Sequence, residues 1–380
     1  MGAADARGYT CGVLSLDLAK FLAAIVSEAP QAGDLLLAVG LPPQAQIGGE
    51  LVRLRVPGLE RLTPFQTEAI VLHLLSHAPV SAAARARQEG AAHFAYSSPG
   101  VNRFRVAVFS QRGTFAVALR TIPERVPALA DLRLPEAMRE ACAERNGIVL
   151  VNGPAGSGRT TSLAAMLGEI NATRSCHVVT VEDPIEFLHR HSKATVNQRE
   201  VGTDTPTLAV GLSGALRQGA QVLLASEPRD CEQARLVLEA AETGHLLLTT
   251  LRGFDTASAV MRLLSLFPAE ERGDVRSRLA RVLRWSFTQQ LVPHRDGRHP
   301  VVEVWRSTRS AAAQLADGPL NSAAMADLMR DGEWEGLVGF DRELEHRVRA
   351  GEIEFETAIA SSALPRQLEL RLLDVREAQA

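Results

Sequence analysis

The chain has 380 residues, 46% of them hydrophobic and 22% charged, which is typical of a soluble globular protein with about two or three domains. Its net charge of −3 argues against a protein that binds nucleic acid over a broad basic surface. No stretch approaches the roughly 20 apolar residues of a membrane span, so we expect no direct membrane insertion.

Cysteine and lysine usage add two constraints. The four cysteines, Cys11, Cys142, Cys176 and Cys231, form no C-x-x-C pair, so the sequence suggests neither a zinc site nor a disulfide framework, and a reducing cytoplasm is expected. Of the 41 basic residues, all but two lysines are arginines. The chain has therefore replaced lysine by arginine almost everywhere.

The first third of the chain has the pattern of a small α+β domain. An apolar helical repeat covers residues 16–26, a strand-like run covers 34–40, and a second helical pattern covers 64–76. Residues 102–120 alternate apolar and polar side chains on both sides of a Gln-Arg-Gly turn, which predicts a β-hairpin. A segment with three prolines, residues 121–135, follows as a linker.

The middle of the chain alternates short apolar runs with helical patterns. Four runs, residues 147–153, 176–184, 221–227 and 245–251, predict buried parallel strands, and residues 159–171 predict a helix between two of them. This alternation is typical of a RecA-like P-loop core.

Beyond Phe267 the pattern becomes helical, through residues 276–293 to a set of helices around 341–371. The expected organisation is an N-terminal α+β domain over residues 1–121, a linker over 122–135, a P-loop core over 136–300 and a helical C-terminal region over 301–380.

A phosphate-binding loop follows the first strand of the core. The stretch GPAGSGRTT fits the pattern G-x-x-x-x-G-K-[S/T], except that Arg159 stands at the lysine position. In such a loop, backbone N–H groups and the start of the next helix surround the phosphates of ATP, and the threonine hydroxyl ligates Mg²⁺. The predicted nucleotide-binding residues are Gly153, Gly156, Ser157, Gly158, Arg159, Thr160 and Thr161, with Thr160 also a metal ligand. The alternative is a glycine-rich turn without a ligand.

Several motifs occur in one order: GPAGSGRTTSLAAM, VTVEDPIEF, VNQREVGTDT, ALRQG, EAAETGHLLLTTL and FPAEER. In this order they resemble the hexameric secretion ATPases, most closely the PilT-type ATPases that retract type IV pili. The N-terminal segments 34–54 and 102–123 resemble the PAS-like domain of the same family. The resemblance thus implies a PAS-like α+β domain over residues 1–121, followed by a RecA-like P-loop ATPase core with a helical C-terminal tail. The tetracysteine insertion that is common in extension-type relatives is absent from the sequence.

The resemblance implies roles for five residues. Glu186 would be the general base that orients the attacking water, and Glu227 would be the Walker B acid that holds the Mg²⁺ shell. His245 would sense the γ-phosphate, and Arg105 and Arg120 would approach the phosphates across a domain or subunit boundary. Plainer interpretations stay open: solvated acids at loop ends for the two glutamates, a polar residue at a helix end for His245, and solvent-facing strand residues for the two arginines.

The sequence departs from the family where the phosphates would bind. Arg159 replaces the loop lysine, and Arg252 replaces the second histidine of the family's T-L-H-T-T box. Gln221 and Ser226 replace an aspartate and a glycine around Walker B, and residues 307–316 replace the family's A-I-R motif. General lysine-to-arginine drift explains residue 159 alone but not residue 252.

Two functions follow from the resemblance and these departures. The first is a hexameric ATPase that drives pilus retraction while bound to an inner-membrane platform protein, cytoplasmic and peripheral at that membrane through its partners. The second is a catalytically impaired paralogue that binds nucleotide and regulates a true retraction motor, in a homo-hexamer or in a mixed ring with a related ATPase. A nucleic-acid translocase is a distant third, because neither basic nor stacking aromatic patterning supports it.

Overall fold

The computed structural model describes residues 17–30, 32–47, 50–56, 59–122, 125–294 and 297–379. Contacts divide the chain into two compact units, Met1–Glu124 and Arg125–Ala380, each with its own hydrophobic core. Cys11 lies outside the described residues, and the other three cysteines are free thiols.

The first unit is an α+β domain with a six-stranded antiparallel sheet in the order β3-β2-β1-β6-β5-β4. Its elements are α1 (Leu18–Glu28), β1 (Asp34–Leu37), β2 (Gln44–Ile47), β3 (Glu50–Arg53), α2 (Pro64–Ser76), α3 (Val80–Glu89), β4 (Ala91–Ser98), β5 (Asn102–Gln111) and β6 (Thr114–Ile122). In β5, the fully buried Phe104, Val106 and Val108 alternate with partly exposed residues, which is the period that the sequence predicted. The two predicted helices, the strand at residues 34–40 and the hairpin are confirmed.

The second unit is an α/β core with a helical C-terminal tail. Its elements are 3₁₀ turns at Leu129–Leu132, Ala269–Glu271 and Glu333–Glu335, and α4 (Ala137–Cys142), β7 (Gly147–Asn152), α5 (Arg159–Thr173), β8 (His177–Glu182), β9 (Thr195–Glu200), α6 (Leu208–Ala215), β10 (Val222–Ala225), α7 (Cys231–Glu242), β11 (Leu246–Leu251), α8 (Thr256–Ser265), α9 (Arg272–Val282), β12 (Leu283–His294), β13 (Gly297–Arg306), α10 (Arg309–Asp317), α11 (Ser322–Asp331), α12 (Phe340–Arg349), α13 (Phe355–Ser361), α14 (Pro365–Arg371) and α15 (Leu373–Gln379).

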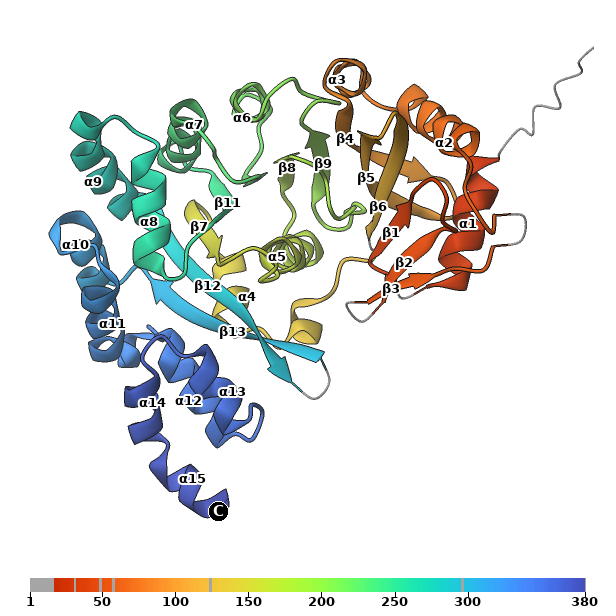
Figure 1. Ribbon diagram of the computed structural model, residues 1–380. Helices are drawn as coiled ribbons and strands as arrows, with labels where there is room; N and C mark the ends of the chain where they lie inside the picture. The colour runs from red at the N-terminus through yellow and green to blue at the C-terminus, as the bar shows by residue number, and fades with distance from the viewer. Residues whose placement is uncertain are drawn as a thin grey trace, which may run out of the picture. The chain divides into compact units, whose positions relative to one another are not determined.

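A seven-stranded sheet in the order β13-β12-β7-β11-β10-β8-β9 forms the centre of this unit. All neighbouring strands are parallel except β12 and β13, which form an antiparallel hairpin at one edge. Helices α6 to α11 contribute to the core on one face, and α4 and α5 contribute to the core on the other (Figure 1). The carboxyl ends of β7, β8, β10 and β11 therefore meet at one edge, where ligands bind in open α/β sheets.

The helical pattern predicted over residues 276–293 is wrong beyond Val282. Strand β12 begins at Leu283 and pairs with both β7 and β13. Its aromatic and β-branched residues, among them Trp285, Phe287 and Thr288, favour a strand, and both of its faces are covered, so the apolar run carries no clear period. Strand β13 extends the sheet past residue 300, where the sequence analysis had placed the end of the core.

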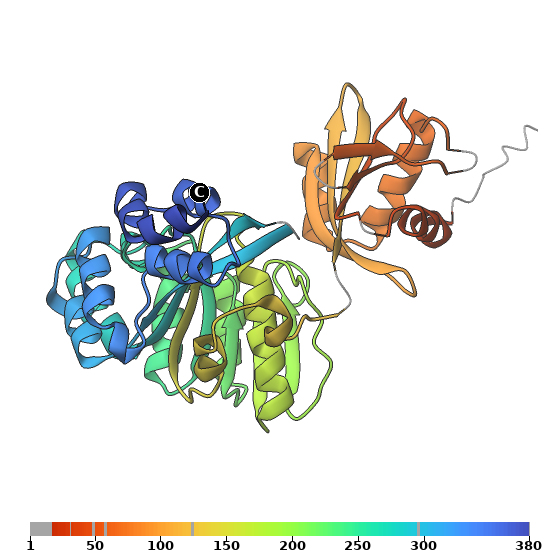
Figure 2. The same ribbon diagram turned by 90° about the horizontal axis from the view of Figure 1, so that it is seen from below.

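The tail packs on the hairpin. Phe340, Leu344 and Leu368 of α12 and α14 form a small core with Val292 of β12 and Val301 of β13, and Figure 2 shows these helices gathered beside the two strands. The predicted helical C-terminal region is confirmed. Among the residues that the structure describes, no helix is both long enough and apolar enough to span a bilayer.

Candidate functional site

The predicted phosphate loop connects the fully buried strand β7 to helix α5. Gly153 has φ 147°, and a β-carbon there would lie 2.3 Å from the Gln289 carbonyl oxygen. Gly158 has φ 87°, and a β-carbon there would lie 2.7 Å from Gln289 Nε2. The two glycines of the pattern are therefore required by both conformation and space.

Gln289 on β12 holds the loop in place. Its Nε2 donates a hydrogen bond to the Ser157 carbonyl at 2.7 Å, and its Oε1 accepts one from Ser162 Oγ on α5 at 2.7 Å. Gln289 is 2% exposed, so these neutral bonds lie away from solvent. Sequence analysis missed this residue, because residues 276–293 were predicted as a helix and no motif marks it.

The first turn of α5 is open to an anion. Its N-terminal residue Gly158 provides no side-chain cap, and the first turn contains no acidic residue. Thr160 and Thr161 are half-buried in this turn, and Gly156 is exposed in the loop. Uncapped N–H groups and the helix dipole at such a terminus favour a phosphate group.

Arg159 extends from the start of α5 to the end of β11. Its Nη1 donates to the Leu251 carbonyl at 2.8 Å and lies 3.8 Å from Glu227 Oε2, and the side chain is 14% exposed. Burial lowers the pKa of the Arg159 guanidinium, and the negative charge of Glu227 opposes that shift. The guanidinium stays charged at neutral pH, because an arginine does not lose its proton in proteins.

Three arginines surround the Glu227 carboxylate. Besides Arg159, the Nε of Arg262 on α8 lies 3.1 Å from Oε1 and the Nε of Arg252 lies 3.5 Å from Oε2. The backbone N–H of Arg252 also donates to Oε1, at 3.3 Å. The structure thus brings both sequence departures, at 159 and 252, onto the predicted Walker B acid. Arg262 was missed, because its place in an ordinary amphipathic helix gives no signal.

The predicted base Glu186 is half-buried beyond the end of β8, and its charge acts on Arg159. A second acid, Glu182, is the last residue of β8 and is 8% exposed. Burial raises the pKa of Glu182 to about 7, although Thr180 Oγ1 at 2.6 Å and Gln198 Nε2 at 3.0 Å donate to its carboxylate. Sequence analysis did not single out Glu182.

The two remaining departures from the family pattern, Ser226 and Gln221, lie at opposite ends of β10. Ser226 lies at this same edge, and its Oγ accepts from the backbone N–H of Asp183 at 2.8 Å, which ties the end of β10 to the end of β8. Gln221 lies at the opposite end of β10, and its Oε1 accepts from the His177 N–H at 2.6 Å. Gln221 is therefore remote from the loop.

The structure does not bring His245 to the loop. His245 precedes β11, and its carbonyl accepts from the N–H of Gly147, the first residue of β7, at 3.0 Å. The loop follows the last residue of β7, so the length of a six-residue strand, about 17–20 Å, separates the two. The imidazole instead bonds the carbonyl of Ala240 at 3.0 Å. The imidazole of His245 therefore lies away from the phosphate loop of its own subunit.

Arg105 and Arg120 lie in the first unit, directly opposite each other on β5 and β6. The Arg120 guanidinium forms a two-bond ion pair with Asp34 of β1, at 2.7 and 2.9 Å. Arg120 is exposed and Arg105 is partly exposed. Both arginines thus share one face of the first unit's sheet.

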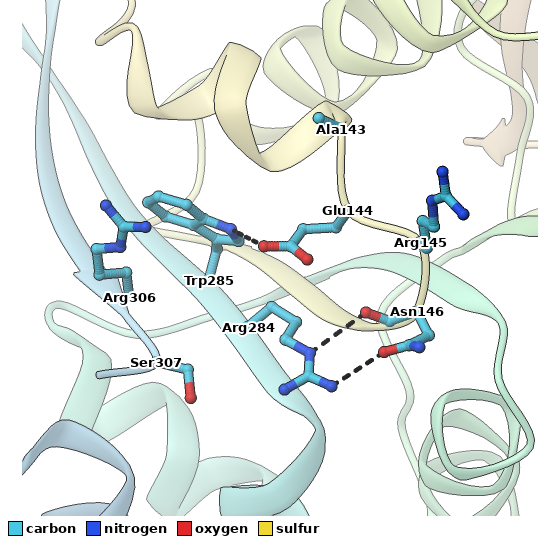
Figure 3. Close-up of a pocket in the computed structure, with 8 residues that line it drawn as sticks. All are labelled: Ala143, Glu144, Arg145, Asn146, Arg284, Trp285, Arg306 and Ser307. Atoms are coloured by element: carbon cyan, nitrogen blue, oxygen red, sulfur yellow. Dashed lines mark hydrogen bonds between the residues drawn. The ribbon is translucent and has the colours of Figure 1, made fainter. Parts of the chain in front are cut away.

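A pocket of about 450 Å³ opens at the amino edge of the core sheet (Figure 3). Arg284 donates to Asn146 Oδ1 at 2.9 Å, and Trp285 Nε1 donates to Glu144 Oε1 at 2.9 Å. The Arg306 guanidinium lies 4.6 Å from the centre of the Trp285 ring. Because β7 separates Asn146 from Gly153, this pocket is distinct from the phosphate loop.

Comparison with known proteins places this geometry in a family. The model of the family "Type II/IV secretion system protein" matches residues 68–321. The type IV pilus ATPase PilU of Pseudomonas aeruginosa is 35% identical over 342 residues, which cover 89% of this chain and 87% of PilU. The type IV pilus retraction ATPase PilT of the same organism is 35% identical, over 92% of this chain and 99% of PilT.

A solved structure agrees. The crystal structure of the pilus retraction motor PilT with bound ADP superposes with a TM-score of 0.82 at 33% identity, covering 92% of this chain and 98% of that chain. Both predicted domains, the N-terminal α+β domain and the P-loop core, are thus shared with a nucleotide-binding motor.

Proposed function

The chain belongs to the type II/IV secretion system protein family, and from this we propose that it is an ATP-binding and hydrolysing ring motor of a type IV pilus system that drives pilus retraction and twitching motility. The observation that carries the proposal is the loop itself: a glycine frame held by Gln289 before an uncapped helix start. Relatives named for pilus retraction and twitching motility, at 35% and 38% identity, support this system.

In this proposal, residues 153–161 bind the phosphates of ATP, and Glu186 orients the attacking water. If Mg²⁺ binds with the nucleotide, it would supply charge that offsets the phosphates. Thr160 offers a hydroxyl in the first turn of α5, which fits a metal ligand. Glu227 does not fit, because guanidinium groups and a backbone N–H already contact both of its oxygens.

Ring assembly completes the site in this proposal. Arg105 and Arg120 would reach phosphates bound by a neighbouring subunit, in a homo-hexamer or in a mixed ring with a related ATPase. The ring would act in the cytoplasm and bind an inner-membrane pilus platform protein, without nucleic acid as a partner.

Subunit mixing tests the ring. Mixtures of Arg120→Ala and Glu186→Gln subunits should regain ATPase activity that neither variant has alone, because each supplies the residue that the other lacks. Asp34→Asn is the matched control: it removes the ion pair with Arg120 but keeps the arginine, and such exposed pairs contribute about 0–1 kcal/mol. Strictly additive loss in every mixture contradicts a shared site.

A second candidate function is a nucleotide-binding regulatory subunit that hydrolyses slowly. The arginines around Glu227 favour it, because they occupy the acid on which metal-assisted hydrolysis depends. Steady-state ATPase measurement on the purified ring separates the two candidates: turnover that approaches the roughly 1–100 per second typical of kinases supports the motor, and turnover far below it supports the regulatory subunit.

A further inference from the structure

The Glu227 carboxylate is surrounded by N–H donors from this chain, most of them cationic. Its Oε1 contacts the Nε of Arg262 and the backbone N–H of Arg252, at 3.1 and 3.3 Å, and its Oε2 contacts the guanidinium groups of Arg252 and Arg159, at 3.5 and 3.8 Å. The side chain is 15% exposed, so these charges interact in a setting that water screens only partly.

We propose that the phosphate loop of this chain binds the free nucleoside triphosphate anion as well as it binds the magnesium complex, with Arg159 and Arg252 supplying the positive charge that the metal supplies elsewhere. This rests on the proposed nucleotide binding, which both candidate functions share.

Charge supports this assignment. Three guanidinium charges face one carboxylate, so the cluster keeps a positive surplus that complements a polyphosphate. A divalent cation on the same carboxylate would stand close to three positive groups that cannot deprotonate. Mg²⁺ also demands oxygen ligands at about 2.0–2.1 Å in near-octahedral geometry, which a carboxylate crowded by N–H donors does not offer.

Exposure identifies which arginines can turn to a ligand. Arg252 is 64% exposed and Arg262 is 46% exposed, whereas Arg159 is 14% exposed and is held by the Leu251 carbonyl. Exposed ion pairs contribute little to stability, so Arg252 can leave Glu227 at little cost. Arg159 stays as the fixed cation between the loop and the acid.

The test measures affinity of the full-length protein for the imido analogue of ATP by calorimetry, with excess Mg²⁺ and with EDTA. We expect the two dissociation constants to agree within about threefold, a difference no larger than a surface ion pair provides. In Arg159→Lys/Arg252→His, Mg²⁺ should tighten binding about tenfold or more, because histidine is largely neutral near pH 7. Arg330→Lys, an exposed arginine on α11, is the matched control and should stay independent of Mg²⁺.

Glu227→Gln provides the second variant. If Glu227 has no metal role, removing its charge should tighten binding of the free analogue and leave the two conditions equal. A loss of affinity only with Mg²⁺ would show Glu227 to be a metal ligand and overturn the inference. Tenfold tightening by Mg²⁺ in the wild-type chain also overturns it and leaves nucleotide binding intact, whereas no saturable binding in either condition refutes the proposed function itself.

Discussion

The two sides of the phosphate loop are held by different kinds of interaction. On the side of β12 and β13, the contacts are neutral hydrogen bonds, led by Gln289 to the loop backbone. On the side of β10 and β11, the contacts are ionic, between Glu227 and three arginines. Neutral bonds depend on geometry and little on salt, whereas the ionic set determines which charges a ligand must bring. The departures from the family at 159 and 252 fall on the ionic side.

Glu303, a buried acid on the side of β12 and β13, shows the same contrast with Glu227. Among the described residues, Glu303 on β13 forms no ion pair; its Oε1 accepts from the N–H and hydroxyl of Thr256, at 2.8 and 2.9 Å, and from the Thr288 hydroxyl at 3.1 Å. Thr256 begins α8, the helix that carries Arg262. The neutral side therefore positions one of the charges of the ionic side.

The largest expected effect is on nucleotide binding, from a substitution at the contact between the loop and Gln289. Gly158→Val should abolish nucleotide binding, because the residue has φ 87° and its β-carbon would lie 2.7 Å from Gln289 Nε2. Titration with a fluorescent ATP analogue measures this. Gly273→Val on α9 is the control, since a β-carbon there meets nothing within 4 Å. Binding by Gly158→Val at wild-type affinity would show that the backbone frame does not form the site.

The next effect concerns stability and pH. Burial raises the pKa of Glu303 from 4.5 to about 7. The folded protein therefore keeps a proton that the unfolded chain releases, so this group's stabilisation is complete below pH 4.5 and is lost as pH rises through 7. The loss amounts to about 3 kcal/mol, at about 1.4 kcal/mol for each unit of pKa.

Glu303→Gln tests this, because the amide keeps the accepting oxygen but never ionises. Denaturant unfolding across pH should show the variant gaining stability relative to the wild type as pH rises from 4.5 to above 7. Glu182, whose pKa burial also raises to about 7, is unchanged in both proteins and cancels from the difference. If the difference in free energy of unfolding between the variant and the wild type does not vary with pH, the raised pKa of Glu303 is contradicted.

Sequence reasoning recovered what local pattern encodes. The glycine frame and the flanking strand and helix follow from spacing and from the ends of apolar runs, and Glu227 beyond the end of β10 follows from the family resemblance. Gln289 and Arg262 were out of reach, because each meets the loop or Glu227 only through pairing of distant elements. Residues 283–294 were assigned to the wrong element for a related reason: a strand covered on both faces has no period to read.

His245 illustrates a second limit. Its motif places it six residues before Leu251, and Leu251 does reach the site, through its carbonyl to Arg159. Strand β11 spans the sheet from its amino edge to its carboxyl edge. His245 and Leu251 therefore lie at opposite edges, although they belong to one sequence motif.

On the ionic side, Arg159→Lys should raise ATP turnover, and adding Arg252→His should raise it further. We expect the planar guanidinium of Arg159 to displace the γ-phosphate from in-line geometry, and a misplacement of about 1 Å can cost on the order of a hundredfold in rate. Because both residues contact Glu227, we expect their effects to be non-additive. Steady-state kinetics of the four proteins measures this. Motor-like turnover by the wild-type chain, unchanged in Arg159→Lys, would identify residue 159 as neutral drift.

The smallest expected effect is on nucleotide affinity, from removal of the hydrogen bonds that Gln289 makes to the loop and to α5. Gln289→Leu keeps the volume of the side chain but leaves the Ser157 carbonyl and the Ser162 hydroxyl without their shared partner, 2% exposed in the wild type. Leaving buried polar groups unpaired costs about 1–3 kcal/mol, so we expect nucleotide affinity to fall about tenfold or more. Because the lost bonds are neutral, the fall should be the same at low and high salt, whereas a change in the Glu227 cluster should depend on salt. Gln290→Leu, next along β12 and partly exposed, is the matched control. Equal affinity in Gln289→Leu and the wild type would mean that the loop keeps its shape without support from β12, and the neutral side would then have no part in binding.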